Sequence, residues 1–219
     1  MTQPTRISRR RLLGSTAAAA GMALAPGLAR ALEPTFFLEM GPFFPIEKPL
    51  DQDADLTIIK GHSDRAQGDI LHLMGRVLNK QGEPVAGARI ELWQANKFGR
   101  YNHPSDPNPA PLDPNFQGSA VQVTDAEGRF RFKTVKPGPY PTGNPNVWRP
   151  PHIHFDVSGR ADRLVTQMFF PGEPMNEVDF VYQAIRRNKQ GSICRLAPPA
   201  AGMESDSRIA YWDIVLPTG

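Results

Sequence analysis

The chain has 219 residues, 40% of them hydrophobic and 21% charged, so it can bury one substantial core, and a disordered, collagenous or coiled-coil protein is excluded. The formal net charge of +3 arises in the first 31 residues, which hold five arginines and no lysine or acidic residue. The remaining body has 20 basic and 22 acidic residues, and this balance excludes a nucleic-acid partner.

The N-terminal 31 residues have the pattern of an export signal. A cationic start precedes a weakly apolar run at 12–28, and the tripeptide Ala-Arg-Ala at 29–31 is typical of a cleavage site. The Ser-Arg-Arg-Arg-Leu-Leu run at 8–13 resembles the twin-arginine signal, which implies export of a folded protein. We therefore expect residues 1–31 to be removed and residues 32–219 to form one periplasmic or secreted domain. The alternative is a retained membrane anchor, but the interrupted apolar run is shorter than the ~20 residues of a membrane span, so no stable membrane insertion is expected.

Alternation of apolar and polar residues after about residue 68 predicts β-strands. Two hairpins are expected, each closed by a turn of polar and glycine residues. Seven or so short strands with turns between them predict an all-β fold, an antiparallel β-sandwich of immunoglobulin or prealbumin type with long loops and one short helix. The hairpins comprise 70–78 with 88–94 and 120–124 with 130–135; further strands are expected at 152–158, 164–170 and 209–216, and the helix at 177–188.

Two histidines separated by one residue lie in the strand predicted at 152–158. His152 and His154 share one face of that strand, while Ile153 and Phe155 point to the other face. Two imidazoles on one face can bind one metal ion. A pair of hydrogen-bonded, partly buried histidines is the alternative for an isolated motif of this kind.

Two tyrosines lie in constrained segments near this strand. Tyr140 lies between Pro139 and Pro141, and Tyr101 ends the run 92–101, in which Gly99 permits a backbone turn that could aim the phenol inward. A phenolate is a hard oxygen donor. Two phenols with two neutral imidazoles therefore favour a hard, Lewis-acidic ion such as Fe³⁺ over zinc.

Three segments carry a family resemblance. WQANKFGRY at 93–101, KPGPYP at 136–141 and WRPPHIHF at 148–155 closely resemble, in this order, the intradiol ring-cleaving dioxygenases, particularly the protocatechuate 3,4-dioxygenase type. The resemblance covers most of residues 35–216. It implies one non-haem Fe(III) per subunit, with four metal ligands: Tyr101, Tyr140, His152 and His154.

The resemblance also implies an activity. Such an oxidoreductase cleaves a catechol-type ring between its two hydroxylated carbons and incorporates both atoms of O₂, which gives a muconate-type diacid. Arg149 and Gln167 match the family's substrate pocket, where Arg149 would stabilise negative charge on the ring and Gln167 would orient it. Tyr140 is implied to be the axial ligand that accepts a substrate proton and leaves. For Arg149 the alternative is a structural ion pair, and for Gln167 a structural role is equally open.

Several features leave alternatives open. Phe43 and Phe44 stand where related enzymes often have tyrosine, which leaves open whether this segment contacts the substrate. The loops 102–117 and 142–147 have no pattern that distinguishes catechol, hydroxyquinol and protocatechuate. Assembly as a homo-oligomer or hetero-oligomer, or action as a single chain, is equally undetermined. From another functional class, the alternative is an exported transthyretin-like β-sandwich binding module without catalytic iron.

Overall fold

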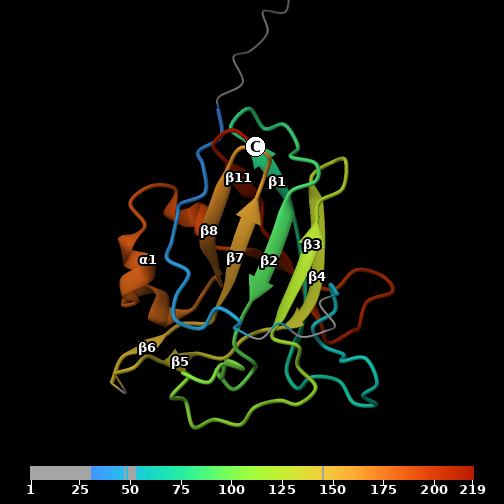
Figure 1. The fold of residues 1–219 in the computed structure, drawn as a ribbon, viewed down its shortest axis with the longest axis vertical. Helices are drawn as coiled ribbons and strands as arrows, with labels where there is room; N and C mark the ends of the chain where they lie inside the picture. The colour runs from blue at the N-terminus through green and yellow to red at the C-terminus, as the bar shows by residue number, and fades with distance from the viewer. Residues whose placement is uncertain (1–30, 47, 49–52, 145) are drawn as a thin grey trace, which may run out of the picture.

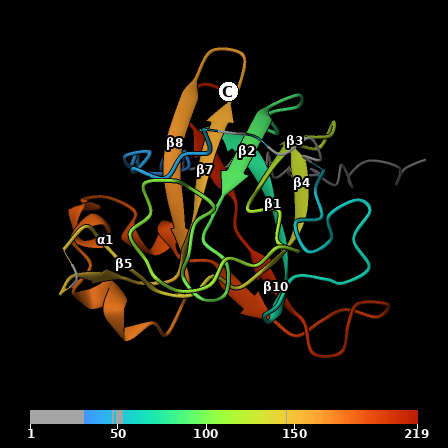
Figure 2. The ribbon, with the colours of Figure 1, turned by 60° about the horizontal axis from the view of Figure 1, so that its bottom comes forward.

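The structure is a computed structural model that describes residues 31–46, 48, 53–144 and 146–219. Apart from residue 31, the expected export signal lies outside the described residues. Two β-sheets pack face to face, and long loops gather at one end of the molecule (Figures 1 and 2). The predicted all-β sandwich is confirmed. Within the described part of the chain, no helix has the length and apolar character needed to cross a membrane.

The described strands form two large sheets and one small one. The first large sheet contains β1 (Ile70–Asn79), β4 (Arg129–Val135), β9 (Arg195–Ala197), β10 (Arg208–Tyr211) and β11 (Ile214–Leu216). The second contains β2 (Arg89–Trp93), β3 (Ser119–Val123), β7 (His152–Ser158) and β8 (Arg163–Phe169), in the order β3-β2-β7-β8. The small sheet pairs β5 (Tyr140–Pro141) with β6 (Trp148–Arg149). The helical elements are α1 (Phe180–Ala184) and the 3₁₀ helices η1 (Pro174–Glu177) and η2 (Lys189–Ser192).

The expected strands are present, but both predicted hairpins are wrong. β1 pairs with β4, β10 and β11, whereas β2 pairs with β3 and β7 in the other sheet. In the same way, β3 and β4 belong to different sheets. Alternation shows which face of a strand is apolar. It does not show whether two such strands are neighbours in one sheet or lie in opposite sheets with their apolar faces in contact across the core. The other pairings between strands are antiparallel, as expected, but β1 also runs parallel to β10 and β11.

The expected helix at 177–188 is much shorter than predicted. Only α1 is α-helical there, and its N-cap is Asp179, whose side chain accepts a hydrogen bond from the Tyr182 amide. Val178, which the apolar spacing placed on the buried side, lies before this cap and is exposed. The expected strand at 209–216 is likewise divided into β10 and β11.

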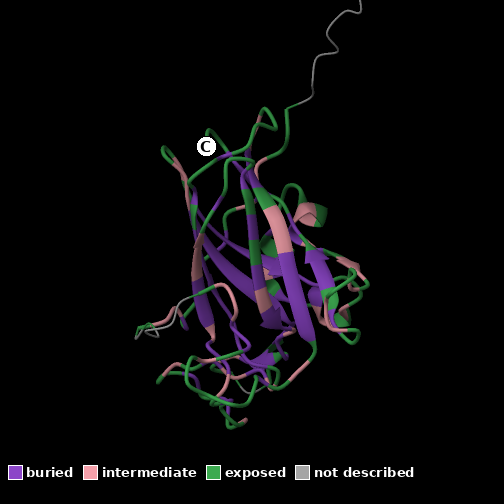
Figure 3. Ribbon diagram, turned by 90° about the vertical axis from the view of Figure 1, so that its right-hand side faces the viewer, coloured by how far each residue is buried: buried purple, intermediate pink, exposed green. Residues whose placement is uncertain are grey.

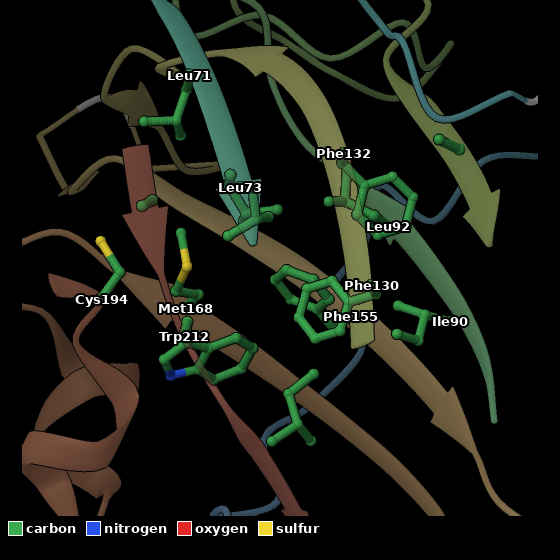
Figure 4. Packing of buried hydrophobic residues seen from close by; sticks show 14 of the residues in the cluster. Leu71, Leu73, Ile90, Leu92, Phe130, Phe132, Phe155, Met168, Cys194 and Trp212 are labelled. Carbon is green, nitrogen blue, oxygen red and sulfur yellow. The ribbon is translucent and has the colours of Figure 1, made fainter. Parts of the chain in front are cut away.

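The core lies between the two sheets and consists of the alternating apolar faces. Figure 3 shows the buried strands running through the middle of the molecule, and Figure 4 shows aromatic and aliphatic side chains from both sheets in contact. Phe155 from β7 packs on Trp212 with ring centroids 5.0 Å apart. On the opposite face of β2, Glu91 was expected in solvent but is buried. Lys48 and Arg89 compensate its negative charge, with nitrogens 2.6 and 3.0 Å from the carboxylate oxygens.

A polar cluster covers the outer face of β1. His72 Nε2 lies 2.9 Å from Glu204 Oε2, and Lys133 Nζ lies 2.6 Å from Glu204 Oε1. The hydrogen bond from Lys133, with further ones from the Glu204 backbone and His72, lowers the pKa of Glu204 from 4.5 to about 2. Through these two contacts, the Glu204 carboxylate attaches the loop between β9 and β10 to strands β1 and β4.

We predict that Glu204→Gln lowers the midpoint temperature of unfolding at pH 7. Because the folded-state pKa is depressed, this stabilisation is present above about pH 4.5 and is lost as the pH falls towards 2, so the difference from wild type should shrink over that range. Thermal unfolding followed by circular dichroism measures it. Glu127→Gln, at an exposed pair with Arg129, is the matched control. A difference between Glu204→Gln and wild type that stays constant from pH 7 to pH 3 contradicts the prediction.

Candidate metal centre

The candidate site lies on the outer face of the four-stranded sheet. Trp93, His154 and Gln167 are directly paired across β2, β7 and β8, so their side chains form one row on that face. Their neighbours Ile153 and Phe155 point into the core, as the alternation predicted. The Trp93 and His154 rings stack with centroids 4.8 Å apart and an interplanar angle of 13°.

The two tyrosines reach this row from the loops at the end of the sandwich, which faces the viewer in Figure 2. Tyr140 lies on β5, directly opposite Arg149 on β6. Tyr101 follows a turn at Gly99, whose φ is +78° and where a Cβ atom would collide with the Pro139 carbonyl oxygen. Glycine thus lets the two tyrosine-bearing loops pack directly together. The Tyr101 and Tyr140 rings meet edge to face, with centroids 5.3 Å apart.

The structure brings all four predicted donors into one buried cluster. His152 Nε2 and His154 Nε2 lie 3.1 Å apart. The Pro150 carbonyl oxygen, 2.7 Å from His152 Nδ1, can only accept a hydrogen bond, so that nitrogen is protonated and the His152 Nε2 lone pair faces His154. Metal–imidazole bonds of about 2.1 Å that meet at a right angle place two nitrogens about 3.0 Å apart. The two imidazoles are therefore spaced as neighbouring ligands of one ion.

The protein atoms alone leave this cluster unsatisfied. Within the described residues, neither the Tyr101 hydroxyl nor His154 Nδ1 has a hydrogen-bond partner, although both are buried. With the His154 proton on Nδ1, the lone pairs of the two Nε2 atoms oppose each other across 3.1 Å. A cation between these nitrogens and the phenols would remove that repulsion and give the Tyr101 oxygen a partner. In the described part of the chain, no group of three or more His, Cys, Asp or Glu side chains could hold a metal, so the phenols are needed to complete the set.

Burial determines the protonation of the donors. It lowers the pKa of both His152 and His154 well below 6.5, and the nearby Arg149 charge lowers each further, so both imidazoles are uncharged. Burial raises the pKa of Tyr101 well above 10, and the pKa of Tyr140 is raised for the same reason. Without an ion both phenols keep their protons. A hard trivalent cation that binds here must release them.

Arg149 is a buried cation beside the donors. Its Nη1 lies 3.2 Å from His152 Nε2, its Nη2 donates to Gln167 Oε1 at 2.9 Å, and its charge lowers the pKa of the Tyr140 phenol on the paired strand β5. Asp179 pairs with it through both carboxylate oxygens. The ion pair considered as an alternative for Arg149 thus exists, and it lies within the site. Gln167 Nε2 in turn donates to the Glu39 carbonyl at 3.1 Å.

Asp179 is the site residue that the sequence interpretation missed. Its place before a short apolar run is typical of a helix N-cap, which is the local signal the sequence contains. That signal does not indicate which side chain the carboxylate would meet. The contact with Arg149 joins residues 30 positions apart and depends on the packing of α1 beside β6.

The segment at 41–44 covers the donors with apolar side chains. The Phe43 ring centroid lies 4.9 Å from that of Tyr101 and 5.8 Å from that of Tyr140, and Phe44 packs edge to face on Trp93 at 5.0 Å. Phe43 and Phe44, which stand where related enzymes often have tyrosine, therefore shield the donors from solvent on this side. A cavity of about 330 Å³ beside them is lined by Phe43, Trp93, Tyr101 and residues of the 102–117 loop. A larger cavity of about 790 Å³ is lined by β1, β4, β10 and the end of β3, and none of the donors lines it.

Comparison with known proteins identifies the family. Residues 40–218 match the family model described as Dioxygenase. The protocatechuate 3,4-dioxygenase beta chain of Burkholderia cepacia is 50% identical over 138 residues, which cover 62% of this chain and 58% of that protein. The chain belongs to the intradiol dioxygenase family.

Other relatives agree with this family. The hydroxyquinol 1,2-dioxygenase of Rhizobium sp. (strain MTP-10005) is 32% identical over 157 residues, 65% of this chain and 50% of that protein. The chain thus spans between half and three fifths of the length of these two relatives. The dioxygenase domain of a carbohydrate-binding fusion from Streptomyces sp. SirexAA-E aligns with a TM-score of 0.63 and 26% identity, over 85% of this chain and 100% of that one. Intradiol dioxygenases are generally Fe(III)-dependent, which agrees with the hard donor set.

We predict that Tyr101→Phe changes the metal binding of this protein without weakening its fold. Removal of a buried hydroxyl without a partner should leave the metal-free protein at least as stable as wild type, because such a group costs about 1–3 kcal/mol. The same variant should bind Fe³⁺ more weakly, since one oxygen donor is lost. Thermal unfolding of the metal-free proteins and ferric titration followed in the visible spectrum measure the two effects.

The matched control is Tyr211→Phe, which removes a partly exposed hydroxyl on β10, in the other sheet. It should change neither quantity. A Tyr101→Phe protein with unchanged ferric affinity would remove this phenol from the donor set.

Proposed function

We propose that this chain is a non-haem Fe(III) dioxygenase that cleaves a catechol-type ring between its two hydroxylated carbons with O₂ and releases a muconate-type diacid. The observation that supports it best is the pair of buried imidazole nitrogens 3.1 Å apart, closed in by two buried phenols. A noncatalytic binding sandwich gives no physical reason to bury four such donors around one point. A bound ferric ion would supply Lewis acidity and accept electron density from the catechol ring.

The chain's own residues would bind the ion, exclude water and orient the substrate. Tyr101, Tyr140, His152 and His154 would hold the ion, and the cover formed by Phe43 and Phe44 would exclude water from it. Arg149 presents a fixed positive charge beside His152 and Tyr140, where negative charge on a bound ring would develop. Gln167 is held between Arg149 and the Glu39 carbonyl, so its amide is oriented before the substrate arrives.

Tyr140 is the proposed proton acceptor among the ligands. It lies directly opposite Arg149 in the β5–β6 pair, and the Arg149 charge lowers the pKa of its phenol against the larger rise that burial causes. Because Arg149 is the cation proposed to act on the substrate, a ring held beside it would also lie beside Tyr140. We therefore assign to Tyr140 Oη the proton that a catechol hydroxyl would give up on binding. With that proton, Tyr140 would be a weaker donor to the ion.

The substrate and the assembly follow from the relatives only as proposals. The similarity to a protocatechuate 3,4-dioxygenase beta chain favours protocatechuate, and a beta chain implies a second kind of subunit, so we propose a heteromer. Catechol and hydroxyquinol are the alternatives, since relatives named for both are similar to this chain. The residues at 8–13 support export by the twin-arginine pathway, with the folded domain released in the periplasm or outside the cell.

We predict near-stoichiometric iron in the purified protein and a visible tyrosinate-to-iron band. Elemental analysis and absorption spectroscopy measure both. Under anaerobic conditions, addition of protocatechuate, catechol or hydroxyquinol in turn should shift the band with the true substrate, because its oxygens replace a ligand. A colourless protein that takes up no ferric iron on reconstitution would contradict the proposed function and favour a binding module.

We predict that Tyr140→Phe keeps the fold, loses most ring cleavage and shifts the visible spectrum, because the phenol that accepts the proton is gone while its ring still packs against Phe43 and His152. Steady-state oxygen uptake and the spectrum measure the effect, and circular dichroism checks the fold. Wild-type colour and rate in this variant would remove Tyr140 from the site.

A further inference from the structure

Asp179 and Arg149 form a fully buried ion pair at the edge of the candidate site. Arg149 Nε donates to Asp179 Oδ2 at 2.9 Å, and Nη2 donates to Oδ1 at 3.1 Å. The side chains are 4% and 0% exposed, respectively. Two parallel hydrogen bonds between planar groups fix the orientation of the guanidinium as well as its position. The carboxylate also compensates a charge that burial would otherwise disfavour.

The carboxylate itself is fixed to the scaffold. Asp179 Oδ1 accepts a hydrogen bond from the Tyr182 amide at 2.7 Å, and the Asp179 amide donates to the Met175 carbonyl at 3.0 Å. Tyr182 then packs on Phe169 of β8 with ring centroids 5.1 Å apart. The carboxylate is thus joined to the same strand that carries Gln167. It cannot shift without disturbing the start of α1.

The other edge of the guanidinium faces the donors. From there Arg149 contacts His152 Nε2 and Gln167 Oε1, and its charge acts on the Tyr140 phenol of the paired strand β5. Three of the groups proposed to act in this site are therefore influenced by Arg149. The position of that one cation depends on Asp179.

We propose that Asp179 is a positioning residue of the dioxygenase site: by binding Arg149 through both oxygens, it holds the guanidinium in the orientation that acts on substrate, Gln167 and Tyr140. Asp179 lies behind the guanidinium and is not among the four donors, so it acts through Arg149. The kinetic consequence rests on the proposed function, whereas the fixing of the guanidinium does not.

The chain offers a matched comparison on β7. Asp156 is buried and binds Arg163 through both oxygens, at 2.9 and 2.7 Å. This pair also joins a carboxylate to a guanidinium, but its arginine is exposed and contacts none of the donors. Loss of the Asp156 charge therefore reports what removal of a carboxylate from a bidentate pair does to stability alone.

The experiment compares Asp179→Asn, Asp179→Glu and Asp156→Asn in the iron-loaded protein. Asparagine is also a favourable N-cap and nearly the same shape, so Asp179→Asn should keep α1 and lose only the charge and the paired geometry. We expect its kcat for the catechol that wild type cleaves to fall about 10- to 100-fold, with a much smaller change in KM, as for other residues that orient groups beside a metal. Asp179→Glu, which keeps the charge, should recover part of kcat. Asp156→Asn should keep kcat whatever it does to the unfolding temperature.

A second readout does not depend on activity. In ¹H–¹⁵N spectra of the metal-free protein, the Arg149 Nε–H should be protected from exchange in wild type and lose that protection in Asp179→Asn. A wild-type protein that cleaves no catechol but shows the protected Nε–H would contradict the proposed function and leave the fixing of Arg149 intact. A kcat for Asp179→Asn within about twofold of wild type, an equal loss in Asp156→Asn, or an unprotected Nε–H in wild type would each overturn the positioning role. If Asp179→Asn does not fold, Asp179→Glu and the wild-type exchange measurement decide the question.

Discussion

β7 is buried on both of its faces, and the rest of the site depends on this constraint. One face carries the apolar side chains of the sandwich core, and the other carries the two histidines. In an antiparallel sandwich one face of a strand can remain in water. Here that face holds uncharged imidazoles, so other parts of the chain must cover it. The loop after β2, the β5–β6 pair, α1 and the segment at 36–44 all serve this purpose.

The electrostatics of the site follow from that cover. Burial keeps the imidazoles neutral and the phenols protonated, so the donors carry no charge until an ion binds. Arg149 is the cation that contacts them, and Asp179 compensates it within the same buried region. The two phenols, once deprotonated, would offset two of the three charges of a trivalent ion, without a carboxylate among its ligands. The arrangement suits a hard oxygen-binding metal better than a soft one.

Much of this architecture could be predicted from the sequence, because local patterns determine it. Alternation in β7 placed His152 and His154 on one face, and the ordered motifs brought Tyr101 and Tyr140 into the same interpretation. Strand pairing could not be predicted, because an apolar face does not specify its neighbour. The role of Asp179 was equally inaccessible: its N-cap signal is local, whereas its contact with Arg149 is made by tertiary packing.

The segment at 36–44, which helps to cover the site, is held in place by a strand that is synthesised much later, β8. Along the edge of β8, the Leu38 amide donates to the Val165 carbonyl, and Thr166 Oγ1 donates to the Phe36 carbonyl, 130 residues away in sequence. This edge would otherwise present unpaired amide and carbonyl groups to other chains. Residues synthesised early therefore find their place only when the strand carrying Gln167 has left the ribosome. The site can therefore be covered only after both segments have been made, by contacts that join residues 130 positions apart.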